Sequence, residues 1–296
     1  MGSHRNRELR KGSSQIFRDV WKTSPHFYVN SLGQAIRYSQ VSDLFKFQWL
    51  ERIFPQGPQI RSLECGCGAA GASAYFAERG YNPTMLDLTE TALVKAQESF
   101  QRYKLQGTFV LGDVLQMPFA DSTFDVIMSF GLLEHFSEPE QPIREMIRLL
   151  KPSGLFFADI VPKKFSVQTL ANFFVNGLAV AVYYTLHGQP WYGLRKGLRK
   201  AVSLEDFYES TYPIERYQQA LVDGGLGRIR WVGATRFPDI YFPFWLMPRW
   251  VRWLKGRREA WLAFGKSNGR FASRFWCRSY WLWGQKPPLR EDAATL

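Results

Sequence analysis

From residue 59 onward, short apolar runs alternate with amphipathic segments of helical period. The apolar runs have the length of buried strands and lie at 59–64, 83–88, 107–113, 123–130 and 154–161. The segments with helical spacing lie at 71–80, 89–104 and 138–150, and Thr89 is the expected N-cap of the second. Strands that alternate with helices in this way predict an α/β fold with a mostly parallel sheet and helices on both faces.

The alternation is interrupted twice and resumes each time. A helix at 213–225, a strand at 228–234 and a last strand within 274–288 restore the α/β pattern. We therefore divide the chain into six segments: a helical N-terminal cap (1–57), an α/β core (58–162), a first insertion (163–210), a continuation of the core (211–235), a basic, aromatic-rich insertion (236–272) and a final strand with its tail (273–296).

The loop after the first predicted strand, LECGCGAAG, allows two interpretations. Residues Gly66 to Gly71 match the G-x-G-x-x-G pattern of dinucleotide-binding loops. The same stretch also reads as an acidic residue, Glu64, followed by G-x-G at Gly66 and Gly68. Both interpretations need a loop without side chains, because a large cofactor must lie against its backbone. Asp87, 21 residues after Gly66, suits the ribose-binding acid of either type.

Other motifs separate the two interpretations. Glu64 stands directly before the loop, where a nicotinamide-dependent dehydrogenase usually has an apolar residue. Downstream, Asp113 opens the stretch GDVLQMPFADSTFDVI, which is followed by LLEHF and LLKPSGLFFADI. In this order and spacing the motifs resemble the class I S-adenosylmethionine (SAM)-dependent methyltransferases, specifically the branch of ubiquinone and menaquinone C-methyltransferases and small-molecule methyltransferases. The resemblance covers about residues 59 to 161 and departs from the family pattern at Ala70, where glycine is usual.

The resemblance implies a Rossmann-like fold with a mostly parallel seven-stranded sheet, SAM as cofactor and S-adenosylhomocysteine as product. It assigns the methionine end of SAM to Glu64, Gly66 and Gly68, and the floor of the cofactor site to Ser129. For Ser129 an equally good alternative is a small polar residue that merely ends a strand.

The resemblance also assigns the adenosine half of the cofactor. Asp87 would bind the ribose hydroxyls and Leu88 would pack on the adenine. Asp113 would accept from the adenine amine, and the Val114 backbone N–H would reach a ring nitrogen. The alternative for the two aspartates is a turn-forming or capping role.

Methyl transfer to a hydroxyl or an acidic carbon is helped by a general base. His135, after the fourth strand, is the first candidate because imidazole titrates near neutrality. The alternative is that the LEHF segment only packs and caps. Asp159, near the end of the fifth strand, is the second candidate.

Two features of composition indicate the partner. The net charge is +12, and residues 231–283 hold eight of the eleven tryptophans with ten Lys or Arg. Tryptophan with cationic residues is typical of proteins at an anionic membrane surface, and also of nucleic-acid binding. We favour the membrane because this region is so apolar. The alternative is an ordinary folded extension in which arginines stack on aromatic rings.

The first insertion holds an apolar run at 170–186, which is shorter than the ~20 residues of a membrane span. Its large apolar and aromatic residues predict an apolar lid over a lipophilic or lipid-linked acceptor: Phe173, Phe174, Leu178, Val182, Tyr183 and Tyr184. The alternative is an additional core helix. The three cysteines form no disulfide framework and, lacking further ligands, predict no metal site.

We therefore expect a methyltransferase that acts at O or C of a lipophilic small molecule, in the cytoplasm and peripherally at the cytoplasmic membrane face. The alternatives are an RNA methyltransferase that uses the basic aromatic region, a soluble natural-product or sugar O-methyltransferase, and a SAM-binding scaffold without activity. Against RNA, SFGLLEHF stands where base N-methyltransferases place an Asn-Pro-Pro-Tyr-type tetrapeptide.

Overall fold

The computed structural model describes most of the chain, namely residues 17–19, 21–22, 28–164, 166, 177–202, 209–234, 249, 251–253, 256 and 277–288. Most of the basic, aromatic-rich insertion, 236–272, therefore lies outside the described residues, as do Phe173 and Phe174 of the predicted lid. No helix among the described residues is long and apolar enough to cross a membrane.

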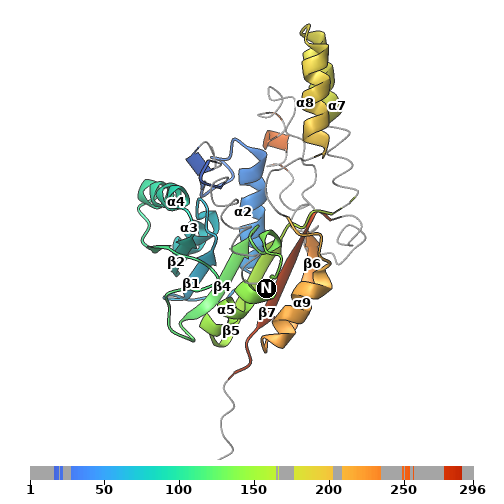
Figure 1. Ribbon diagram of the computed structural model, residues 1–296. Helices are drawn as coiled ribbons and strands as arrows, with labels where there is room; N and C mark the ends of the chain where they lie inside the picture. The colour runs from blue at the N-terminus through green and yellow to red at the C-terminus, as the bar shows by residue number, and fades with distance from the viewer. Residues whose placement is uncertain are drawn as a thin grey trace, which may run out of the picture.

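A seven-stranded sheet forms the centre of the molecule, with the strand order β3-β2-β1-β4-β5-β7-β6 (Figure 1). The first five strands pair in parallel, and β7 runs antiparallel between β5 and β6. The strands are β1 (Arg61–Cys65), β2 (Asn82–Asp87), β3 (Thr108–Leu111), β4 (Phe124–Phe130), β5 (Leu150–Ile160), β6 (Gly227–Ala234) and β7 (Ser279–Gln285). This confirms the predicted mostly parallel, Rossmann-like α/β sheet.

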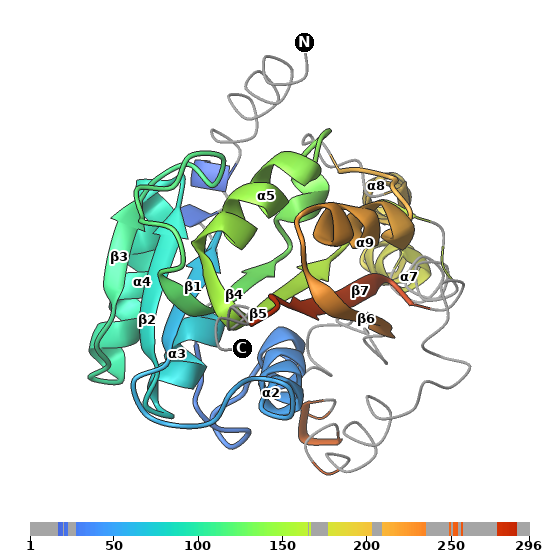
Figure 2. The same ribbon diagram turned by 90° about the horizontal axis from the view of Figure 1, so that it is seen from below.

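Helices cover both faces of the sheet, as Figure 2 shows in the view from below. Helices α2, α3 and α4 contribute to one apolar core, and α5 and α9 contribute to the other. Successive strand residues point to opposite faces: Ile127 packs in the α5–α9 core and Met128 in the α2–α4 core. The helices are α2 (Tyr38–Leu50), α3 (Gly71–Ala77), α4 (Glu90–Arg102), α5 (Glu140–Leu149), α7 (Leu178–Leu186), α8 (Pro190–Val202) and α9 (Ile214–Asp223), with a 3-10 turn η1 (Leu133–His135).

Element boundaries agree with the sequence pattern to within a few residues, with two informative differences. β5 begins at Leu150, four residues before the predicted start, because Leu150 still pairs with Phe124 across a bulge. Thr89 occupies the predicted N-cap position of α4, but its hydroxyl donates to Asp87 Oδ1 at 2.9 Å and makes no cap hydrogen bond to the helix.

Helices α7 and α8 form a hairpin that stands away from the sheet, on the side where the parallel strands end (Figure 1). The two helices pack mainly on each other. Helix α2 lies between the hairpin and the α3–α4 region (Figure 1).

Candidate functional site

Neighbouring parallel strands end side by side and thereby gather the predicted site residues. Cys65, the last residue of β1, pairs with Leu86 on one side and Ser129 on the other. Phe130, the last residue of β4, pairs with Asp159 of β5. In open α/β sheets ligands bind at this carboxyl edge, so the register brings the glycine loop and the acidic residues to one cleft.

The loop after β1 turns through backbone conformations that favour glycine. Gly66 has φ 67° and Gly68 has φ 52°, both in the left-handed region. The N–H groups of Gly66 and Cys67 both donate to the Leu86 carbonyl, at 2.8 and 3.1 Å, and fasten the loop to β2. A Cβ on Gly66 would lie 3.0 Å from the Leu132 side chain. The loop therefore presents bare backbone to the cleft.

Ala70, where the family pattern has glycine, keeps the glycine-type turn. Its φ and ψ are 53° and 39°, its side chain is fully buried, and its N–H donates to the Cys67 carbonyl at 2.7 Å. An L-residue in this conformation costs about 1–2 kcal/mol. At Gly71 an added Cβ would make only an ordinary contact, 3.6 Å from Phe47. The alanine thus adds local strain to a loop that turns through left-handed conformations at Gly66, Gly68 and Ala70.

Glu64 lies in β1 directly beneath this loop and is 4% exposed. Its Oε2 accepts from both the N–H and the hydroxyl of Ser73, at 2.9 and 2.6 Å. Burial raises the pKa of Glu64 to about 7, although the two hydrogen bonds from Ser73 oppose the shift. A carboxyl group in this state changes charge near neutral pH and responds to a cation placed beside it.

Asp87 ends β2 and holds the loop and the start of α4 together. Its Oδ2 accepts from Gly68 N at 3.0 Å, and its Oδ1 accepts from the N–H and the hydroxyl of Thr89, both at 2.9 Å. Burial raises the pKa of Asp87, and these hydrogen bonds act in the opposite direction. The carboxyl group lines the cleft, so the turn-forming and the ligand-binding interpretations of this residue coexist.

One cavity of about 150 Å³ joins Asp87 to the residues after β3. Leu88, Asp113 and Val114 line it, together with His135. Asp113 Oδ1 accepts from Leu115 N at 3.0 Å, which fixes the turn in which it lies. The four positions that the sequence assigned to the adenosine half of the cofactor therefore share a single cavity, which we name the adenosine-side cavity, or adenosine half of the cleft, after that prediction.

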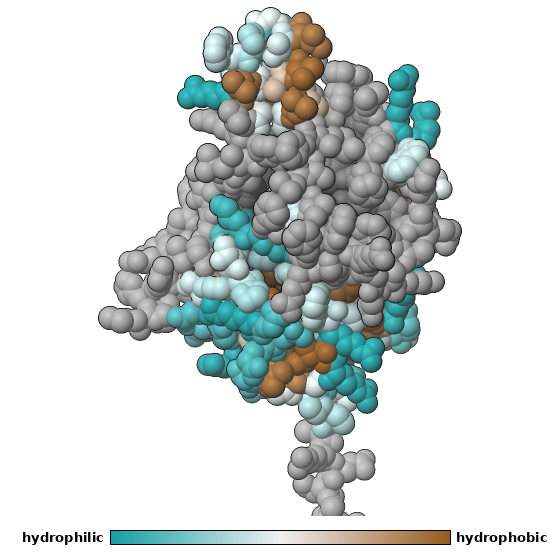
Figure 3. Space-filling model, turned by 90° about the vertical axis from the view of Figure 1, so that its right-hand side faces the viewer, coloured by the Kyte–Doolittle hydropathy of each residue, from teal (hydrophilic) through white to brown (hydrophobic). Residues whose placement is uncertain are grey.

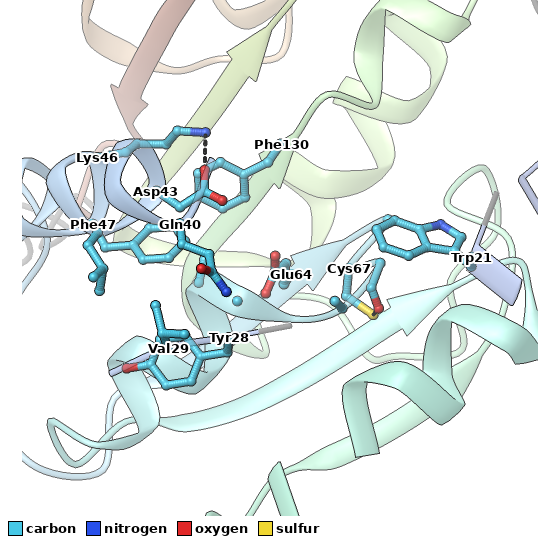
Figure 4. A pocket seen from close by; sticks show the side chains of 16 residues that line it. Trp21, Tyr28, Val29, Gln40, Asp43, Lys46, Phe47, Glu64, Cys67 and Phe130 are labelled. Carbon is cyan, nitrogen blue, oxygen red and sulfur yellow. Dashed lines mark hydrogen bonds and ion pairs between the residues drawn. The ribbon is translucent and has the colours of Figure 1, made fainter. Parts of the chain in front are cut away.

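A second cavity, of about 190 Å³, lies on the other side of the glycine loop (Figure 4). We name it the methionine-side cavity, or methionine half of the cleft, after the predicted position of the cofactor. Glu64, Gly66 and Gly68 line its floor, as predicted for the methionine end, and Gln40 and Lys46 of α2 line its wall. Phe47 and Phe130 add apolar surface to that wall.

Trp21 separates the two cavities and lines both. A Cβ built on Gly68 would lie 2.3 Å from Trp21 Cζ2, so the indole ring rests directly on the glycine backbone. In Figure 4 the ring lies at one end of the cavity, beyond Cys67, and α2 lies at the other. Gly66 and Phe130 also line both cavities, which are thus two halves of one cleft.

Comparison with known proteins identifies the part of the chain that builds this cleft. Residues 63–158 match the family model described as a methyltransferase domain. The chain carries a class I methyltransferase domain. This confirms the resemblance seen in the sequence motifs, and the matched residues run from β1 to β5.

Curated relatives of the methyltransferase domain act on different substrates by name. The ubiquinone/menaquinone biosynthesis C-methyltransferase of Roseobacter denitrificans is 34% identical over 116 residues, which are 38% of this chain and 46% of that protein. Sterol methyltransferase-like 2 of Botryococcus braunii is 33% identical over 141 residues, 47% of this chain and 35% of that protein. The matched part spans less than half the length of either relative.

Solved structures share the fold of the methyltransferase domain. The [4+2]-cyclase SpnF superposes with a TM-score of 0.57 at 17% identity, over 93% of this chain and 95% of that one. Phosphoethanolamine N-methyltransferase 2 of Haemonchus contortus, solved with SAM, gives 0.54 at 16% identity, over 92% and 60%. Because one of the two is named a cyclase, the fold by itself does not fix the reaction.

The candidate bases of the methyltransferase domain lie in different surroundings. His135, in η1, lines the adenosine-side cavity, and its ring meets Phe17 edge-on with centroids 5.1 Å apart. Asp159 is 2% exposed, and its Oδ2 lies 2.7 Å from Lys46 Nζ. Ser129 is fully buried, and its hydroxyl has no hydrogen-bond partner among the described residues.

Lys46 is a site residue that the sequence analysis missed. It lies within the apolar side of α2 and is 6% exposed, with its ammonium 5.1 Å from the centre of the Phe130 ring. The ammonium reaches both the methionine-side cavity and Asp159. A single cation inside the apolar run LFKFQWL was the available signal.

Glu134, also missed, is buried beside the Lys46–Asp159 pair. Its Oε1 accepts from Val161 N at 3.1 Å, and its Oε2 has no hydrogen-bond partner within the described part of the chain. Burial, reinforced by the negative charge of Asp159, raises the pKa of Glu134 to about 8. Two carboxyl groups and one ammonium thus form a buried cluster under the end of β4.

The predicted lid is not formed by the described residues of the first insertion. Leu178 and Val182 are 63% and 48% exposed in the projecting hairpin, and the cleft is lined instead by N-terminal residues such as Trp21 and Gln40. The apolar pattern of 170–186 indicated a helix correctly in its second half, but pattern alone does not say which way a helix points.

Proposed function

We propose that this chain transfers a methyl group from SAM to O or C of a lipophilic or lipid-linked small molecule met at a membrane surface. The observation that carries the proposal is that one cleft gathers the glycine loop, Glu64, Asp87 and Asp113. The methyltransferase domain match supports the same chemistry.

The residues of the cleft fit SAM along its length. Glu64, beside the bare backbone of Gly66 and Gly68, would face the cationic methionine end. Asp87 would accept from the ribose hydroxyls, and Asp113 from the adenine amine. SAM carries its methyl group on a sulfonium, from which the thioether departs readily as a leaving group. Methyl transfer therefore needs mainly alignment of the acceptor and exclusion of water.

Trp21 would have to leave or reorient at the Gly68 contact for one ligand to fill both cavities. The ring rests on the very backbone that the resemblance assigns to the cofactor. We therefore propose that the Trp21 ring moves off the Gly68 backbone when the cofactor binds.

Among the candidate bases, His135 remains the first candidate for the general base. It lines the cleft, and an imidazole can accept a proton from a hydroxyl or an acidic carbon at neutral pH. Asp159 is the second candidate, and its carboxylate is paired with the Lys46 ammonium at 2.7 Å. Substituting His135→Gln and Asp159→Asn separately, and comparing the pH dependence of kcat, distinguishes the two.

A lipophilic acceptor is supported by the wall of the methionine-side cavity. Val29, Leu44, Phe47 and Phe130 line it, with Lys46 as the nearby cation. An apolar pocket with few polar groups is typical of sites for small apolar ligands. The relatives named for sterol and for ubiquinone or menaquinone methylation are consistent with this class of acceptor.

Calorimetric titration with SAM, S-adenosylhomocysteine and NADH tests the cofactor. We expect the two sulfur ligands to bind and NADH not to, and Asp87→Asn to weaken binding by about 10- to 100-fold, because charge-assisted hydrogen bonds to the ribose are lost. Asp223→Asn, an exposed acid at the end of α9, is the matched control. Binding of NADH alone would overturn the proposal. Labelled SAM with extracted lipids and, separately, with RNA then identifies the acceptor class.

A further inference from the structure

The tip of the α7–α8 hairpin displays large apolar side chains. Leu186 ends α7 and is 81% exposed, and Trp191, in the first turn of α8, is 82% exposed. Gly188, with φ 77°, makes the tight turn between them. In Figure 3 apolar residues gather over this projecting part, at the top of the molecule. The most exposed large apolar residues described thus lie at the point farthest from the sheet.

Packing within the hairpin does not explain these residues. Gly193 and Gly197 of α8 face α7: a Cβ on Gly193 would lie 2.8 Å from the Ala181 carbonyl oxygen, and one on Gly197 would lie 2.6 Å from the Gly177 carbonyl oxygen. Helices held by close backbone contact through small residues are typical of a lipid environment, where apolar side chains need not be hidden. The hairpin thus buries these two glycines between the two helices and exposes large apolar side chains to solvent.

The exposed apolar residues share one side of α7, and the hairpin is cationic. Leu178, Val182 and Leu186 recur every four residues and are all about half exposed or more. Residues 177–202 contain four Lys or Arg and no Asp or Glu. Lys196 Nζ donates to the hydroxyls of Tyr184 and Tyr192, at 2.9 and 3.3 Å. Apolar residues at a tip, followed by tyrosines and cations, match the depth profile of a membrane interface.

We propose that the tip of the hairpin, with Leu186 and Trp191, inserts into an anionic lipid surface while the cations of α8 contact the headgroups. This inference deepens the proposed function, because it names the part of the chain that meets the lipid. The hairpin rises on the side where the parallel strands end (Figure 1), so docking would turn the cleft toward lipid-borne acceptors. A second copy is a poorer occupant, since a symmetric contact would place the cations of two hairpins together.

Vesicle flotation with phosphatidylcholine, with and without phosphatidylserine, tests the insertion on the full chain. We expect flotation with the anionic vesicles, and a loss of about tenfold or more in apparent lipid affinity for the double variant Leu186→Ser, Trp191→Ser. The matched control is Val94→Ser, Val222→Ser, which removes two exposed apolar residues from helices of the core and should leave flotation unchanged.

A site-specific probe makes the test independent of folding. The three native cysteines are buried, so Leu186→Cys can be labelled with an environment-sensitive fluorophore, and Val222→Cys serves as the control. Anionic vesicles should shift the emission at position 186 to the blue and leave position 222 unchanged. Flotation without a shift at 186 would overturn the proposal, as would a concentration-dependent dimer abolished by Leu186→Ser. SAM titration of the same variants reports separately on the proposed function, since the cofactor cleft is untouched.

Discussion

The two halves of the cleft are built in different ways. The adenosine half is made mainly by residues at or just after the ends of parallel strands, such as Asp87 of β2 and Asp113 after β3, together with Trp21. The methionine half combines the glycine loop with Gln40 and Lys46, which come from a helix that precedes the sheet. One half depends on local backbone geometry, and the other depends on how a helix docks.

This difference decides what a substitution does. In the adenosine half the paired backbones of β2 and β3 hold the neighbouring residues in place, so an exposed side chain such as Leu88 can change with little effect on folding, whereas Asp87 also fastens the glycine loop. In the methionine half the buried Lys46–Asp159 pair and Glu134 join α2 to the sheet, so ligand contacts and stability share the same residues.

The largest effect is expected at Lys46. Lys46→Met would leave the Asp159 carboxylate buried without its cation, which should cost about 3–5 kcal/mol of unfolding free energy. The double variant Lys46→Met, Asp159→Asn should recover at least half of that loss, because the uncompensated charge is gone. Urea unfolding measures both. Equal losses in the single and double variants would show that the pair does not connect the two regions.

The glycine loop gives the next largest effect. Gly68→Ala should weaken SAM binding by about tenfold or more, because φ is 52° and a Cβ there would stand on the bare backbone that the cofactor has to approach. Gly71→Ala is the matched control and should stay within about threefold of the unsubstituted protein, since its Cβ has room. Calorimetric affinities decide the matter, and similar losses at both positions would contradict the loop geometry described above.

Glu134 predicts a pH dependence of stability. Its folded pKa is raised to about 8 from the ordinary 4.5, so the folded state holds a proton that the unfolded state releases as the pH rises between these values. Stability from this group should therefore fall across that window and level off above it. Glu134→Gln should flatten the profile and gain about 1–3 kcal/mol over the unsubstituted protein near pH 8. Parallel profiles for the two proteins would remove Glu134 as the cause.

The smallest effect concerns Glu64 and the cofactor. A cationic ligand favours the ionised carboxylate, so binding should release a proton from Glu64 below its pKa of about 7 and tighten by about three- to tenfold as the pH rises through that value. Glu64→Gln should bind with a weaker dependence on pH. Titrations in buffers of different ionisation enthalpy measure the released proton directly, and an unchanged release in the variant would exclude Glu64 as its source.

Sequence reasoning was most successful where function follows chain order. Asp87, Asp113 and the glycine loop lie together because each directly follows a parallel strand, and strands that pair in register end at one edge. Ala70, where the sequence departs from the family pattern, has a φ of 53°, which the sequence did not predict.

Residues that reach the site through the packing of elements distant in sequence were harder to predict. Lys46 lines the cleft, and Glu134 is buried beside the Lys46–Asp159 pair, because α2 and η1 place these residues next to the end of β5, and no local spacing records that arrangement. The sequence also did not predict the direction of the α7–α8 hairpin, because the same apolar pattern is compatible with a lid over the cleft and with the projection away from it that Figure 1 shows.

The glycine seam of the hairpin has a consequence for how the chain tolerates variation. Gly193 and Gly197 touch no part of the cleft, yet any side chain there would separate the two helices. Saturation mutagenesis scored only for folded yield should find these two glycines among the least replaceable positions between 177 and 202 and accept polar residues at Leu186 and Trp191. When the same library is scored for binding to a lipid surface, substitutions at the two glycines and polar substitutions at Leu186 and Trp191 should all be rejected. Positions that tolerate substitution in the folding screen but not in the lipid-binding screen would be those that contact lipid.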